Sequence, residues 1–214
     1  MDNRKFVLEA CCTSAEQVFR AAKAGADRVE LCENLEIGGT TPSEESIRRA
    51  VTAGIPVNVL IRPRGGNFTY SPEEEEQMAA SIVRCRELGA AGVVFGALLP
   101  DGSVDRKMME RLLEKAHGGN GQRRLSVTFH RAIDECADPF QALETIMESG
   151  FDRILTSGHE SSAVRGSALL AEFVRRAAGR IIIMPGGGVT AENVRLLAEI
   201  TGASEFHGTR ICRL

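Results

Sequence analysis

Aromatic residues are scarce in this sequence, which has no tryptophan and a single tyrosine among 214 residues. Few rings are available to stack on bases, and the net charge of −3 is made of interspersed charges of both signs, so we expect no nucleic-acid partner. No stretch approaches the roughly 20 apolar residues of a membrane span, and residues 1–12 carry charges where a signal peptide would be apolar. These absences predict a cytoplasmic protein without a membrane partner.

Residues that two common enzyme classes require are also missing from the expected positions. No lysine falls at the carboxyl end of a predicted strand, which disfavours a Schiff-base aldolase or a lysine-dependent racemase, because both need an amine in the site. No His-x-His motif follows the first predicted strand, which disfavours a zinc hydrolase. The six cysteines are expected to be free, since cytoplasmic thiols stay reduced. The lysines are Lys5, Lys23, Lys107 and Lys115.

What the sequence does contain is a repeat of roughly 30 residues, in which a helix-like stretch runs into a glycine and a short apolar strand follows. Repeated βα units favour a TIM (β/α)8 barrel, here a single α/β domain over residues 1–214. An open doubly wound sheet is the alternative, but no GxGxxG fingerprint follows the first strand. The glycines are Gly25, Gly54, Gly89, Gly118, Gly150, Gly179 and Gly202. The predicted strands are 6–10, 28–31, 57–61, 92–95, 125–129, 153–156, 181–184 and 205–206.

Three segments predict the starts of helices. Each combines a capping side chain with a proline at the first helical position and Glu or Gln at the third. These segments are 41–44 (TPSE), 71–74 (SPEE) and 138–141 (DPFQ).

The end of the chain is short for a complete barrel, because 208–214 is too brief for the helix that normally follows the eighth strand. We expect this last helix to be missing or truncated. Either an apolar groove is then left between the first and seventh helices, or another subunit covers it. A homo-oligomer is therefore predicted.

Two neighbouring predicted strands end in the same pattern, Glu9-Ala10-Cys11 and Glu30-Leu31-Cys32. Residues two apart share a face of a strand, and adjacent strands lie about 4.8 Å apart, so the thiols are expected to approach each other near the barrel mouth. Two soft sulfurs in this position suit Cu(I). The alternative is that both thiols only pack in the interior.

The carboxylates of Glu9 and Glu30 are expected below the thiols. Acidic side chains inside a barrel must be paired, protonated or functional. Mutual repulsion raises the pKa of one of them and makes the pair a candidate acid and base. The alternative is a structural pairing with arginine, for which Arg62 and Arg64 at the end of the third strand are candidates.

Further polar residues follow the later strands. His130 is a candidate general acid, base or ligand, and Arg131 beside it is a candidate anion-binding residue. Gly186, Gly187 and Gly188 follow the seventh strand and are expected to open a helix capped by Thr190, where backbone amides bind an anion. Alternatively this segment is only a tight turn. His207, after the eighth strand, completes the candidate site.

Several blocks of the sequence resemble the CutC family, named as copper homeostasis proteins. They are 24–32 (AGADRVELC), 38–43 (GGTTPS), 61–66 (IRPRGG), 128–132 (TFHRA) and 155–158 (LTSG), and the match extends from the first strand to the eighth. The resemblance implies a cytoplasmic barrel linked to copper tolerance, in which Cys11 and Cys32 bind copper as Cu(I). The second hypothesis is an enzyme acting by acid/base chemistry on a small phosphorylated or carboxylated metabolite, because the predicted mouth has more charged residues than one metal ion requires. In this hypothesis Glu9 or Glu30 transfers protons, and the anionic group is bound by the glycine segment and by Arg62, Arg64, Arg131 and His207.

Overall fold

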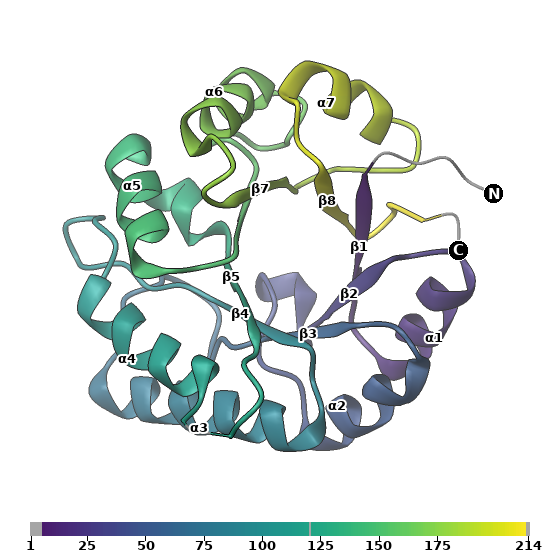
Figure 1. Cartoon of the computed structure of the whole chain (residues 1–214), viewed down its shortest axis with the longest axis vertical. Helices are drawn as coiled ribbons and strands as arrows, with labels where there is room; N and C mark the ends of the chain where they lie inside the picture. The colour runs from purple at the N-terminus through teal and green to yellow at the C-terminus, as the bar shows by residue number, and fades with distance from the viewer. Residues whose placement is uncertain (1–5, 120, 213–214) are drawn as a thin grey trace.

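The protein forms a barrel of parallel strands surrounded by helices, as seen in a computed structural model that describes residues 6–119 and 121–212. Eight strands lie side by side in the described residues, in the order β7-β6-β5-β4-β3-β2-β1-β8 (Figure 1). The predicted TIM barrel is confirmed. The strands are β1 (Val7–Cys12), β2 (Arg28–Leu31), β3 (Val57–Leu60), β4 (Gly92–Phe95), β5 (Ser126–Phe129), β6 (Arg153–Thr156), β7 (Ile182–Pro185) and β8 (Glu205–Gly208).

Closure of the barrel brings the two ends of the chain's strand series together. β1 pairs with β2 on one side and with β8 on the other, so that Glu9 lies opposite both Arg28 and His207. β7 and β8 are connected beyond their ends by a parallel bridge between Thr190 and Arg210. Residues more than 170 positions apart in the sequence thus become neighbours inside the barrel.

Helices form the outer layer of the barrel (Figure 1). Their buried residues, such as Leu112 and Leu143, pack on apolar strand residues to form the main core. Gly89 and Gly150 end α3 and α5 with φ near +90°, a conformation that suits glycine. The helices are α1 (Ala15–Lys23), α2 (Glu44–Ala50), α3 (Pro72–Leu88), α4 (Arg106–His117), α5 (Pro139–Ser149), α6 (Ser167–Ala177) and α7 (Val194–Thr201), with 3-10 helices η1 (Leu35–Ile37), η2 (Val51–Ala53) and η3 (Arg131–Glu135).

Two of the three predicted helix starts are confirmed. Ser71 forms a capping box with Glu74 before α3, and the side chain of Asp138 caps α5. The predicted start at Thr41 is wrong, because α2 begins two residues later than expected and is capped by Ser43. Thr41 is instead bound to the end of β3, where it exchanges hydrogen bonds with the backbone of Arg62.

Several predicted strand ends also differ from the structure. β1 extends through Cys12 and β8 through Gly208, so Cys11 and His207 lie within strands rather than after them. The backbone of Cys11 is consequently fixed by the pairing of β1 with β2, and the backbone of His207 by the pairing of β8 with β1.

The region after β8 contains no helix among residues 209–212, the last that the structure describes. On α7, Leu196 and Ile200 are about half exposed, at 51% and 49%. These residues lie one helical turn apart and therefore share a face. The predicted homo-oligomer stays a prediction. Within the described residues, no helix has the length and apolar character needed to cross a membrane.

Buried charges fill the amino-terminal end of the barrel interior. The guanidinium of Arg28 donates to the carboxylates of Glu9 and Glu205, and Arg153 donates to Glu205 over 2.7 Å. Arg28 also reaches Met184 on β7, 3.4 Å away. Since buried charges persist only when paired, each member of this network depends on the others.

We predict that Arg28→Met lowers the free energy of unfolding by about 3–5 kcal/mol, because it leaves buried carboxylates without their partner. Urea denaturation monitored by circular dichroism measures the change. The control is Arg124→Met, which removes an exposed partner of Asp152 and should cost no more than about 1 kcal/mol. Equal effects of the two substitutions would contradict the importance of the network.

Asp134 organises the loop that follows β6 at the opposite end of the barrel. Its carboxylate accepts hydrogen bonds from the Thr156 hydroxyl at 2.5 Å, from the Ser157 backbone at 2.9 Å and from Arg131 at 2.8 Å. Burial opposes ionisation of Asp134, but these hydrogen bonds outweigh it and hold the pKa below its usual value. The ionised form therefore stabilises the fold.

We predict that Asp134→Asn destabilises the protein by about 1–3 kcal/mol at pH 7. Folding lowers the pKa of Asp134, so its contribution is complete above the unfolded value of about 3.9 and disappears as the pH falls through the lower folded value. The difference between parent and variant in urea denaturation should thus shrink below about pH 4. A difference that stays constant from pH 7 to pH 3 would contradict this role.

Candidate functional site

A cavity of about 310 Å³ opens at the carboxyl-terminal ends of the strands. In a TIM barrel this end carries the active site, because loops from all eight strands converge there. Most of the residues that the sequence singled out line this cavity: Cys11, Glu30, Arg62, His130, Arg131, Gly187, Gly188 and His207. Sequence positions from strands β1 to β8 are thus brought together at one mouth.

The two predicted cysteines face each other at this mouth. The Sγ atoms of Cys11 and Cys32 lie 4.0 Å apart, and both cysteines are free thiols. The two thiols come together because of the register between β1 and β2. In this register Cys11 is paired with Glu30, and the backbone N–H of Cys32 donates to the carbonyl of Cys12. The hydrogen bond with Cys32, burial and the nearby Glu30 carboxyl all raise the pKa of the Cys11 thiol well above its ordinary value.

Cys11, Glu30 and His207 form a cluster in which their potential ligand atoms lie within 4.8 Å of one another. The imidazole of His207 is fixed by a 2.9 Å hydrogen bond between its Nδ1 and Oε1 of Glu9. With Glu9 ionised, Nδ1 is the donor in this bond, so Nε2 is the nitrogen that can bind a metal when it carries no proton. Burial lowers the pKa of His207, but the carboxylates of Glu30 and Glu9 outweigh burial and raise it.

Glu9 and Glu30 occupy different electrostatic environments although they lie on adjacent strands. Burial raises the pKa of Glu9, but Arg28 and His207 outweigh it and lower the pKa to about 2. Burial raises the pKa of Glu30 to about 7, and its Oε2 has no hydrogen-bond partner among the described residues. The repulsion expected between the two carboxyls is present as a smaller contribution to the pKa of Glu30.

The arginine that pairs with the buried carboxylate is Arg28, and the proposed pairing with Arg62 or Arg64 is not found in the described residues. Sequence reasoning missed Arg28, although a signal was present. Arg28 is two residues before Glu30 in the same strand, and residues two apart share a face.

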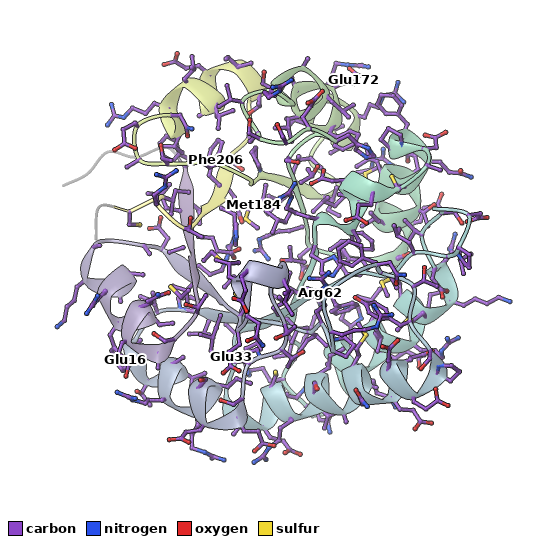
Figure 2. The ribbon with its side chains drawn as sticks, turned by 180° about the vertical axis from the view of Figure 1, so that it is seen from behind. Glu16, Glu33, Arg62, Glu172, Met184 and Phe206 are labelled. Atoms are coloured by element: carbon purple, nitrogen blue, oxygen red, sulfur yellow. The ribbon has the colours of Figure 1, made fainter. Side chains whose placement is uncertain are left out.

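Arg62 and Arg64 lie in different places despite their proximity in sequence. Arg62 is only 5% exposed and lines the cavity, and Figure 2 shows it near the centre of the molecule beside the short helix η1. Arg64 is bound to Glu74 at the start of α3 and lies over the ring of Tyr70, outside the mouth cavity. β3 ends at Leu60, so the alternation of a strand no longer places residues 62 and 64 on one face.

His130 follows β5 and is 5% exposed. Its Nδ1 accepts a hydrogen bond from the backbone N–H of Ala132 at 3.2 Å, which caps η3. Burial, reinforced by the charge of Arg62, lowers the pKa of His130 to about 3. The imidazole is therefore neutral at physiological pH, and because Nδ1 accepts, Nε2 carries the proton.

The glycine segment after β7 forms a turn rather than the predicted start of a helix. α7 begins at Val194, with Asn193 preceding it, so the predicted cap at Thr190 is wrong. Thr190 is held instead by the bridge to Arg210 and by the side chain of Asn193. The segment nevertheless reaches the site, because Gly187 and Gly188 line the cavity while Gly186 lies next to them against β6.

The amino-acid sequence was compared with known protein families and proteins. The sequence model of the CutC family matches residues 6–212. A CutC family protein of Parabacteroides distasonis is 51% identical over 205 residues, which cover 95% of this chain and 82% of the relative. The copper homeostasis protein cutC homolog of Homo sapiens is 46% identical over 205 residues, covering 94% of this chain and 72% of the relative.

Solved structures agree with the sequence comparison. A crystal structure of a CutC protein from Streptococcus agalactiae superposes with a TM-score of 0.89 and 37% identity, covering 96% of this chain and 99% of the other. Fold and sequence thus lead to the same assignment, and the chain belongs to the CutC family.

Proposed function

We propose that the protein binds Cu(I) at the barrel mouth through the thiolates of Cys11 and Cys32, with His207 as a further ligand. The observation that carries this proposal is that potential metal ligands from β1, from the end of β2 and from β8 lie close together. The two sulfurs lie 4.0 Å apart, and Cys11, Glu30 and His207 offer ligand atoms within 4.8 Å of one another.

The chemistry of these donors fits Cu(I). Thiolate sulfur is the ligand type that Cu(I) prefers, and imidazole nitrogen also suits copper. The Glu9 carboxylate holds the Nδ1 side of His207, an arrangement in which a carboxylate orients a metal-binding imidazole. Glu30 has an unpartnered oxygen beside this group, and because its pKa is raised to about 7 it supplies negative charge once it is ionised.

Copper binding at these thiols requires the loss of their protons. Both thiols are largely enclosed by the barrel, and the pKa of Cys11 is raised, so the metal must displace a proton that the apo site holds firmly. The bound ion therefore compensates an electrostatic cost that the empty thiolates would impose. This cost favours a soft cation that binds sulfur strongly over Mg²⁺ or Ca²⁺, which prefer oxygen.

The family supports the proposal at a coarser level, because relatives in this family are named as copper homeostasis proteins. We propose the cytoplasm as the location, since reduced cysteines persist in that compartment. The contrasting interpretation is that Cys11 and Cys32 only fill space, and they do pack on Leu60 and Val94. A binding measurement separates the two interpretations.

We predict that Cys11→Ala/Cys32→Ala weakens Cu(I) binding by at least roughly a hundredfold, because both soft ligands are lost. Competition with a chromophoric Cu(I) chelator under anaerobic conditions measures the affinity.

The matched control is Cys12→Ala/Cys85→Ala, which also removes two buried thiols but leaves the mouth cluster intact. This control variant should retain the affinity of the parent. The proposal fails if the Cys11/Cys32 variant competes for copper as well as the parent does, or if both double variants lose copper equally.

A further inference from the structure

The mouth cavity contains a second group of polar residues, which are not among the proposed copper ligands and whose hydrogen bonds the described residues do not complete. Arg62 Nε and His130 Nε2 are both buried without a partner among the described residues. Each side chain is 5% exposed, and both line the cavity. A buried donor without an acceptor destabilises the fold, so two of them in one cavity point to a ligand that accepts both hydrogen bonds.

Arg62 carries a positive charge that no carboxylate neutralises in the described residues. Its terminal nitrogens donate to the backbone carbonyls of Ile37 at 3.2 Å, Gly39 at 3.1 Å and Gly66 at 2.6 Å. These neutral partners take three of the five N–H donors of the guanidinium and fix its position, and Arg62 also interacts with the Tyr70 hydroxyl. Nε–H is buried without an acceptor among the described residues. Buried charges are normally paired, so the charge of Arg62 calls for an anion.

His130 presents a second donor of fixed identity to the same cavity. Its Nδ1 accepts from Ala132, so the neutral ring carries its proton on Nε2. Phe68 lies next to both groups, with its ring 4.8 Å from the Arg62 guanidinium carbon and 4.8 Å from the centre of the His130 ring. The pair thus consists of one cationic donor and one neutral donor beside an apolar surface.

We propose that this part of the cavity binds a small organic acid, whose carboxylate accepts hydrogen bonds from Arg62 Nε–H and His130 Nε2–H. One positive charge matches a carboxylate better than a phosphate dianion, and the ring of Phe68 suits the carbon skeleton of the acid. Arg131 at the rim does not add a second positive charge to this site, because its guanidinium is paired with the carboxylate of Asp134. Neither Arg62 nor His130 is among the proposed copper ligands, although both groups line the same cavity.

Substitutions at His130 separate binding from structural support. In His130→Asn the amide oxygen reaches the position of Nδ1 and keeps the cap on Ala132, but the Nε2–H donor is lost. In His130→Gln the amide nitrogen reaches the position of Nε2 and keeps the donor, but the cap is lost. A binding role and a capping role therefore predict opposite orders for the two variants.

The test is calorimetric titration of the copper-free protein with pyruvate, acetate and inorganic phosphate at millimolar concentrations. We expect pyruvate and acetate to bind the parent more tightly than phosphate does. We expect His130→Asn to weaken pyruvate binding by about tenfold or more, while His130→Gln stays within a few fold of the parent. His117→Asn, at the end of α4, is the matched control and should bind as the parent does.

A second readout follows the histidine directly. In the ¹⁵N spectrum of imidazole-labelled protein, the Nε2 resonance of His130 should shift when pyruvate is added. The proposal is overturned if neither carboxylate binds, if phosphate binds in preference to both, or if His130→Asn binds pyruvate as tightly as the parent. It is also overturned if His130→Gln loses more affinity than His130→Asn, because the cap alone would then explain the residue.

Discussion

The buried carboxylate of Glu9 connects the two halves of the barrel interior. It lies between Arg28 on β2 and His207 on β8, because β1 pairs with both of these strands. One oxygen accepts from Arg28 and from Asn58, and the other accepts from the imidazole of His207. If this position lost its charge, the ion pairs at the base and the orientation of His207 at the mouth would both be disturbed. The same carboxylate therefore stabilises the ion pairs at the base of the barrel and orients His207 at its mouth.

The mouth itself combines two chemistries that rarely serve a single ligand. On the β1, β2 and β8 side lie two sulfurs and an imidazole, which suit copper, together with the carboxyl of Glu30. Arg62 and His130, which follow β3 and β5, have donor hydrogens suited to an anion. A copper site explains the first set and leaves the second without a role. The proposed carboxylate site gives that second set a function within the same cavity, so that cation and acid are neighbours in one barrel.

The sequence predicted those features that depend on local pattern. The βα repeat predicted the barrel, and the identical spacing of Glu9 to Cys11 and Glu30 to Cys32 predicted two thiols facing each other, since both pairs obey the alternation of a strand. Features that depend on where a strand ends were harder to predict from the sequence. Arg64 was predicted at the mouth because it follows the third predicted strand, but β3 ends at Leu60 and the side chain binds Glu74 instead. The partner of Glu9 was missed because pairing across the interior joins residues by register rather than by sequence distance. The role of each site residue in binding stays a prediction.

The central claim is that the mouth cluster binds copper through sulfur and imidazole. X-ray absorption at the copper edge, on protein loaded anaerobically with one equivalent of Cu(I), tests this claim most directly because it identifies the atoms bound to the metal. The account predicts sulfur neighbours together with nitrogen, and loss of the sulfur signal when Cys11 and Cys32 are both replaced. A spectrum with only nitrogen and oxygen neighbours, or one unchanged by that replacement, would contradict it.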